Sequence, residues 1–172
     1  MIRKIAMGIM IFLTVILQCV LFQVFEIASI KPNLLLILTV SYGLMRGRMS
    51  GLLTGFFSGL AVDILFPGQV GLHALIYMWL GYLSGYLYRI FYDDDIKTPL
   101  LLVTAADFVY GIYMYVVTFL IRGRLHFSYY LTRIIIPEVL YTIIITIFVY
   151  RLLFHFEQLL SKTDKRSVDS LV

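Results

Sequence analysis

Between positions 47 and 63 the chain reads GRMSGLLTGFFSGLAVD, in which Gly47, Gly51, Gly55, Gly59 and Asp63 recur at every fourth position. Residues four apart lie on one side of an α-helix, so the four glycines form one narrow seam. Inside a membrane, such a seam lets a second helix approach closely. We call these four residues the glycine seam and expect it to pack against another helix, either of this chain or of a partner.

The sequence on both sides of this stretch is strongly apolar. Of the 172 residues, 61% are hydrophobic and 14% are charged, whereas an ordinary globular chain has about 25% charged residues. A soluble fold of this size could not cover so much apolar side chain with polar groups, and lipid as the solvent removes that difficulty. The composition therefore predicts an all-α integral membrane protein.

Six apolar stretches divide the chain into candidate membrane spans. They cover residues 5–25, 32–45, 49–66, 71–92, 98–121 and 134–156. Five of them are long enough to cross a hydrocarbon core of about 30 Å at about 1.5 Å per residue, and the second is short. We therefore expect residues 1–160 to form one six-helix transmembrane domain, followed by a flexible cytoplasmic tail at residues 161–172.

The basic residues between the spans predict the orientation, because such residues concentrate on the cytoplasmic side. With six spans and the N-terminus inside, ten of the 14 basic residues are cytoplasmic: Arg3, Lys4, Arg46, Arg48, Arg89, Lys97, Arg151, Lys162, Lys165 and Arg166. Without the short second span only five are, namely Arg3, Lys4, Arg122, Arg124 and Arg133. We therefore expect a multi-pass protein of the bacterial inner membrane with both termini in the cytoplasm.

Several classes of function are disfavoured. The formal charge of +4 could suggest nucleic acid as a partner, but the basic residues lie in small groups between apolar runs instead of on one face. Cys19, the single cysteine, cannot form an internal disulfide or a cysteine metal cluster. No nucleophile is paired with a base, and His73, His126 and His155 fall on different span ends without ligand spacing. We therefore expect a protein that is not an enzyme and that binds neither a metal nor another cofactor.

Asp63 lies at the end of the glycine seam, near the outer end of the third predicted span. A carboxylate at that depth is costly unless it is paired, protonated or close to water. A turn with Pro67 and Gly68 follows, and then Gly71 and His73 at the start of the next span. The structural interpretation is that Asp63 caps the next helix or binds the backbone of this turn. Recognition of a partner, or an ion or proton pathway, are the alternatives.

Two further acidic residues lie inside predicted spans. Asp107 is about nine residues from the inner start of the fifth span, and Glu138 is about four residues from the outer start of the sixth, which places them about a turn or more apart in depth. A shared proton or cation site is therefore an alternative that we do not favour. The arginines at positions 122, 124 and 133 are nearer, and we expect a structural ion pair with Glu138. Pro137, directly before it, can kink the last span.

The middle of the chain resembles the family of the rod shape-determining membrane protein MreD. The resemblance rests on PNLLL at 32–36, Arg46 and Arg48, the glycines and Asp63 of the stretch 51–63, Gly68, GLHAL at 71–75 and GYL at 81–83. The length, the six spans and the cytoplasmic ends also agree, so the resemblance covers the whole chain in layout. The last two spans match loosely, through Asp107 and Pro137-Glu138.

This resemblance implies a scaffold or interaction subunit of the cell-elongation complex, which supports cell shape and lateral peptidoglycan synthesis. The implied partners are an MreC-like bitopic protein, a RodA-type glycosyltransferase with its class B penicillin-binding protein, the MreB cytoskeleton indirectly, and the lipid bilayer. The implied fold is similar to the substrate-binding subunits of energy-coupling-factor vitamin transporters. The alternative function is therefore a small-molecule-binding subunit of a vitamin-type transporter, with a cavity lined by polar groups at the outer span ends.

Overall fold

The computed structural model describes residues 2–24, 32–65, 71–89, 96–120 and 127–169, and in these residues the chain is helical with short connections. The helices are α1 (Ile2–Val24), α2 (Leu34–Arg46), α3 (Arg48–Leu65), α4 (Leu72–Ser84), α5 (Lys97–Tyr115), α6 (Phe127–Tyr130) and α7 (Ile136–Asp169). A short 3-10 helix, Leu87–Arg89, follows α4. The π-helical segments Val116–Leu120 and Leu131–Ile135 extend α5 and join α6 to α7. The prediction of an all-α chain is confirmed for these residues.

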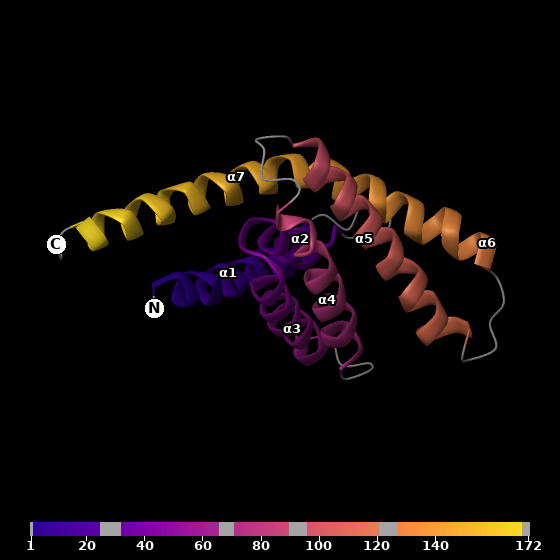
Figure 1. Ribbon diagram of the computed structural model, residues 1–172. Coiled ribbons are helices and arrows are strands. Elements are labelled where there is room, and N and C mark those ends of the chain that lie inside the picture. Colours follow the sequence, from indigo (N-terminus) through magenta and orange to yellow (C-terminus); the bar gives the residue numbers. More distant parts are fainter. Residues whose placement is uncertain (1, 25–31, 66–70, 90–95, 121–126, 170–172) are drawn as a thin grey trace.

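Helix α2 lies at the centre of the bundle (Figure 1). Every residue from Pro32 to Leu44 is buried, and α2 contacts α1, α3, α4, α5 and α7. A helix that is apolar on all sides is buried on all sides, and the run LLLILTV at 34–40 has this character. The short second apolar stretch of the sequence is therefore the core of the bundle.

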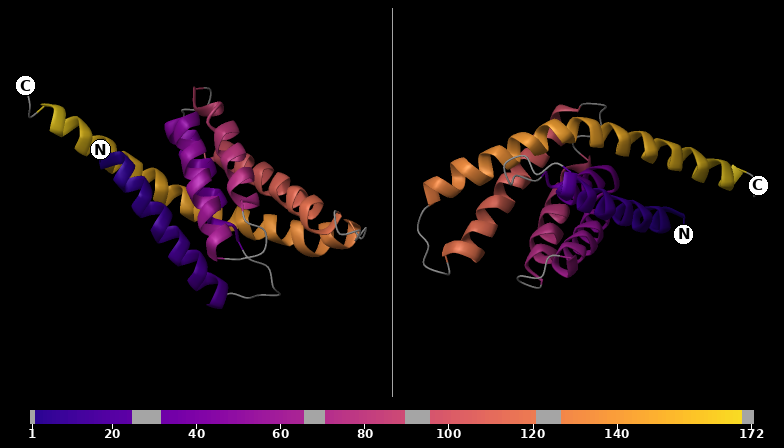
Figure 2. Two further views of the ribbon diagram at one scale, coloured as in Figure 1. Left: turned by 90° about the horizontal axis from the view of Figure 1, so that it is seen from below. Right: turned by 180° about the vertical axis from the view of Figure 1, so that it is seen from behind.

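Four of the other helices form two antiparallel pairs around α2. Helices α3 and α4 lie side by side along most of their length (Figure 1). Helix α5 packs against α7, and this second pair covers another side of α2. Two further views show that the N-terminal end of α1 and the C-terminal end of α7 extend away from the bundle on the same side (Figure 2).

The outward faces of these helices are apolar. By length and composition, the segments Arg48–Leu65, Lys97–Thr118 and Phe127–Phe156 are able to cross a membrane, and Met7–Cys19 and Leu34–Arg46 are shorter apolar helices. Large apolar side chains are exposed on several helices, among them Phe12, Trp79 and Phe148. A large exposed apolar surface is unusual for a soluble monomer and ordinary for a protein surrounded by lipid.

Two helix ends differ from the sequence-based boundaries. The predicted span 71–92 is interrupted, because α4 ends at Ser84 and Gly85 follows, where the chain packs against the backbone of Arg48. The predicted flexible tail from residue 161 is helical as far as Asp169. No glycine or proline lies between Pro137 and Asp169 to end the helix. The predicted span ends at 25, 66, 90–92 and 121, and the last residues 170–172, fall outside the described residues.

Pro137 accounts for the π-helical turn that precedes α7. Proline has no N–H to donate to the carbonyl four residues earlier, and its ring collides with that carbonyl in a regular α-helix. In the structure the N–H of Ile136 donates to the carbonyl of Leu131, five residues earlier. The wider π-helical turn therefore relieves the disruption that the sequence predicts at this position.

Candidate functional site

The glycine seam is filled by α4. A β-carbon added to Gly51, Gly55 or Gly59 would lie closer than 3.0 Å to backbone atoms of α4. The backbone atoms belong to Gly81, Tyr77, Met78, His73 and Ala74. Of the two occupants that the spacing allows, the structure therefore places a helix of this chain in the seam, and a partner has no access to these three glycines.

Gly47 has a different role from the other glycines of the seam. It lies between α2 and α3 with φ at +87°, in the left-handed region that side chains rarely adopt. An added β-carbon there would approach only the ring of Tyr88, at 3.7 Å. Gly47 therefore permits the sharp turn that sets α3 against α2.

Three glycines on the facing helices complete this contact. A β-carbon on Gly81 would collide with the carbonyl of Gly51, and one on Gly85 would collide with the backbone of Arg48. Gly43 of α2 faces Gly81 and Ser84 in the same way. The site prediction did not include these glycines as a packing surface, although the spacing Gly81-x-x-x-Gly85 is the signal that could have found two of them.

Asp63 joins the end of α3 to the start of α4. Its Oδ2 accepts hydrogen bonds from the backbone N–H groups of Gly71 (3.0 Å) and Ala74 (3.1 Å). Its Oδ1 accepts one from the backbone N–H of His73 (3.3 Å) and one from the ring Nδ1 of His73 (2.8 Å). The first N–H groups of a helix have no partner within it, so one carboxylate from α3 satisfies the otherwise open end of α4.

This arrangement leaves Asp63 little capacity for another ligand. Its side chain has no exposed surface, and its two oxygens together accept four hydrogen bonds. Gly71 precedes α4 with φ at +93°, which favours glycine. Pro67 and Gly68 of the predicted turn lie outside the described residues. The geometry corresponds to the helix-capping interpretation of Asp63.

A second group of polar side chains lies between α2, α4, α5 and α7. We call it the polar cluster; its members are Asn33, Tyr77, Asp107, Tyr110, Glu138 and Thr142. Asn33 Oδ1 accepts a hydrogen bond from the N–H of Leu36 (3.2 Å), which caps α2, and one from the hydroxyl of Tyr77 (2.5 Å). The N–H of Asn33 donates to Thr142 Oγ1 at 3.5 Å. The rings of Tyr77 and Tyr110 are in contact, with centroids 5.5 Å apart.

Both intramembrane acidic residues belong to this cluster. Asp107 is 2% exposed and faces Thr142, yet neither of its carboxylate oxygens has a hydrogen bond of good geometry within the described part of the chain. Glu138 interacts electrostatically with Asp107. Tyr110 interacts with both carboxyl groups.

In the structure Asp107 and Glu138 lie near enough to interact electrostatically, although the sequence predicts different depths for them. That prediction counted Glu138 from a span start at residue 134, whereas the helix begins at Phe127 and passes through a π-helical turn. Arg133 is exposed, and the structure does not pair it with Glu138. Arg133 and Glu138 are five positions apart, which corresponds to a rotation of about 140° on a regular α-helix and places their side chains on different faces. The arginines at 122 and 124 lie outside the described residues.

The polar groups of the cluster are of the kind that can bind a ligand. Among the residues that the structure describes, no group of three or more His, Cys, Asp or Glu side chains is arranged to hold a metal ion. Hydroxyl groups of Thr142 and Tyr110 lie near the acids of the polar cluster, and among the described residues neither acid forms an ion pair with a basic side chain. Such a set of groups can hold a positive charge but offers no activated nucleophile.

Comparison with known proteins gives one result. The family model for the rod shape-determining protein MreD matches residues 1–160 of the chain. The matched region contains the glycine seam, Asp63 and the whole polar cluster. No curated protein and no solved structure gives a significant match.

Proposed function

Because the chain belongs to the rod shape-determining protein MreD family, we propose that it is a non-enzymatic scaffold of the complex that builds the lateral cell wall. The observation that carries this proposal is the family match, which covers residues 1–160 of 172. The family resemblance seen in the motif between Pro32 and Gly85 is confirmed by this match. The family's role in rod shape determination makes cell shape the property to measure.

We place the protein in the inner membrane as a multi-pass protein with both termini in the cytoplasm. The distribution of basic residues supports this orientation. The arrangement of the helix ends also supports it, because the N-terminal end of α1 and the C-terminal end of α7 extend on the same side of the bundle (Figure 2). An even number of spans returns the chain to the side on which it started.

Reporter fusions test this orientation. Reporters joined at Arg3 and at Val172 should both give a cytoplasmic signal, because ten of the 14 basic residues are cytoplasmic in the six-span arrangement. The measurement is the activity of paired reporters that work only in the cytoplasm or only outside it. A signal from outside the cytoplasm at Val172 would require an odd number of spans and exclude the proposed topology.

As a scaffold, the protein would recognise its partners through the outward faces of its helices. The glycine seam is filled by α4, and Asp63 is committed to capping that helix, so neither is available to another protein. The faces that remain carry exposed apolar side chains such as Trp79 and Phe148. Contacts between helices in lipid depend on close packing and a few polar groups, and the proposed partner is a bitopic protein of the MreC type.

The wider complex follows from the same family assignment. A RodA-type glycosyltransferase and its class B penicillin-binding protein would supply the enzymatic activity. The MreB cytoskeleton would be linked indirectly, through the other membrane subunits. In this proposal the chain contributes binding surface and membrane anchorage, and it carries out no reaction of its own.

Depletion in the host tests the function. Cells that lose the protein should become rounded and should lose lateral incorporation of a fluorescent D-amino acid, because the elongation complex would lack its scaffold. A plasmid copy carrying Gly8→Ala should restore both properties, since a β-carbon at Gly8 meets nothing within 4 Å. Cells of normal shape with impaired uptake of a vitamin would instead favour the transporter-subunit alternative.

A further inference from the structure

The carboxylate of Asp107 is the buried group that the scaffold role leaves unexplained. Both of its oxygens are shielded from solvent, and Thr142, which Asp107 faces, does not give either of them a hydrogen bond of good geometry. Asp107 in turn acts electrostatically on a second carboxyl group, that of Glu138. A buried polar group without a partner is costly, and a carboxylate inside a membrane bundle is more costly still.

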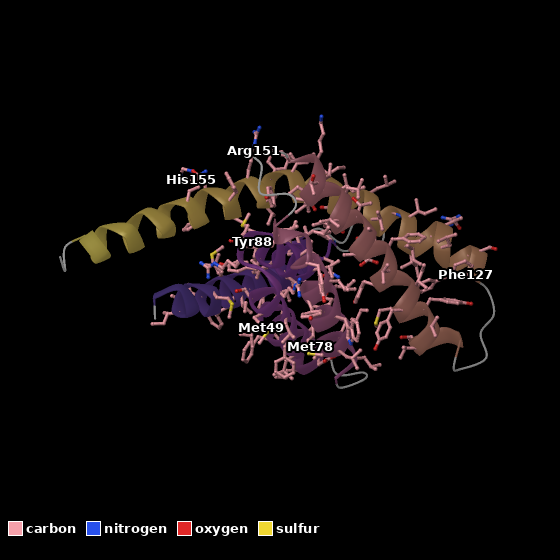
Figure 3. The ribbon with its side chains drawn as sticks, in the orientation of Figure 1. Met49, Met78, Tyr88, Phe127, Arg151 and His155 are labelled. Carbon is pink, nitrogen blue, oxygen red and sulfur yellow. The ribbon has the colours of Figure 1, made fainter. Side chains whose placement is uncertain are left out.

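Several basic side chains of the described residues have contacts or positions away from the cluster. Arg46 lies over the ring of Tyr42, and Arg48 lies over the ring of Tyr86. Arg151 and His155 point away from the bundle (Figure 3), and His73 contacts Asp63. Within the part of the chain that the structure describes, neither acid of the polar cluster forms an ion pair with a basic side chain.

The remaining groups of the cluster offer oxygen atoms as ligands for a cation. Thr142 and Tyr110 contribute hydroxyl groups next to the carboxyl groups, and Asn33 contributes an amide oxygen through its contact with Tyr77. Oxygen ligands without nitrogen or sulfur favour hard cations such as Na⁺ or Ca²⁺ over zinc or copper.

We propose that Asp107 and Glu138, with the hydroxyl groups of Thr142 and Tyr110, bind a small hard cation of the alkali or alkaline-earth class between α5 and α7. This inference goes beyond the scaffold function and does not depend on it. The cluster connects the pair α5 and α7 to α2 and α4, because Asn33 contacts both Tyr77 and Thr142. Occupation of the site would hold the second helix pair against the central helix.

The test is the thermal stability of the purified full-length protein in detergent. The protein is freed of metal with a chelator and kept in N-methyl-D-glucamine chloride, and NaCl, KCl, CaCl₂ or MgCl₂ is then added at constant ionic strength. A ligand that binds only the folded state raises the melting temperature. We expect at least one of these cations to raise it by about 2–4 °C or more, where about 2–4 °C is the shift expected at a cation concentration a few times the dissociation constant.

Matched variants locate the response. Asp107→Asn and Glu138→Gln should each abolish the shift, whereas Asp63→Asn, which removes a carboxylate outside the cluster, should keep it even if its melting temperature is lower. Should Asp107→Asn fail to fold, Glu138→Gln and binding of radioactive ²²Na⁺ or ⁴⁵Ca²⁺ to the unmodified protein decide the question. A wild-type melting temperature that responds to pH but to none of the four cations would mean that protons take the place of the ion and would overturn the proposal. A shift that persists in both cluster variants would place the site elsewhere and overturn it equally.

Discussion

Gly55→Leu should prevent the protein from folding into a stable bundle. A β-carbon at this position would collide with the carbonyl of Tyr77 and lie 2.9 Å from the backbone nitrogen of Met78. Overpacking of a tight core typically costs about 1–3 kcal/mol. The upper end or more is expected here, because the obstructing atoms are backbone and α4 would have to move away from α3 along its length.

Size-exclusion chromatography and thermal melting in detergent measure this effect. The Gly55→Leu protein should be aggregated or absent from the folded peak, and Gly55→Ala should fold with a clearly lower melting temperature. Gly8→Leu is the matched control, because Gly8 is an exposed helical glycine with no atom within 4 Å of an added β-carbon. Gly8→Ala should leave the melting temperature unchanged. If Gly55→Ala also left it unchanged, the close contact between α3 and α4 would not exist.

Asp63→Ala should produce the second large loss of stability. The change removes the acceptor of three backbone N–H groups and of the His73 ring. Loss of a helix cap alone costs about 1 kcal/mol, and each buried donor left without a partner adds about 1–3 kcal/mol. A total loss of about 3 kcal/mol or more follows even if water reaches some of these groups.

The neighbouring substitutions separate this capping role from a simple loss of charge. Asp63→Asn keeps the shape and one acceptor oxygen, so its loss should be intermediate. His73→Phe removes one donor and leaves the three backbone hydrogen bonds, so its loss should be the smallest of the three. We therefore expect the melting temperatures to increase in the order Asp63→Ala, Asp63→Asn, His73→Phe. An Asp63→Ala protein as stable as the unmodified chain would show that the carboxylate does not hold the start of α4.

The features that could be predicted from the sequence are those encoded by local spacing. Glycines four residues apart define one side of a helix whatever surrounds it, so the glycine seam was visible before the fold. A carboxylate eight to eleven residues before the open end of the next helix was also visible as a candidate cap. The helix that fills the seam could not be predicted, because the spacing shows that a helix can pack there but does not show which helix it is.

The polar cluster could not be predicted in the same way because its members come together only in the folded bundle. Asn33 and Thr142 are 109 positions apart. The sequence singles out Asp107 and Glu138, but their predicted depths rest on expected span starts, and the last helix begins earlier and contains a π-helical turn. The short second span also appeared marginal by length, whereas burial on all sides by other helices explains both its length and its composition.

The most direct test of the scaffold function is the identity of the proteins that copurify with this chain. The protein carries an affinity tag, native membranes are dissolved in mild detergent, and the bound material is identified by mass spectrometry with an untagged strain as the control. We predict that a bitopic protein of the MreC type is recovered in amounts comparable to the chain itself. Recovery of the intact, folded chain without any bitopic partner, accompanied by a bound vitamin-sized molecule, would contradict the scaffold function.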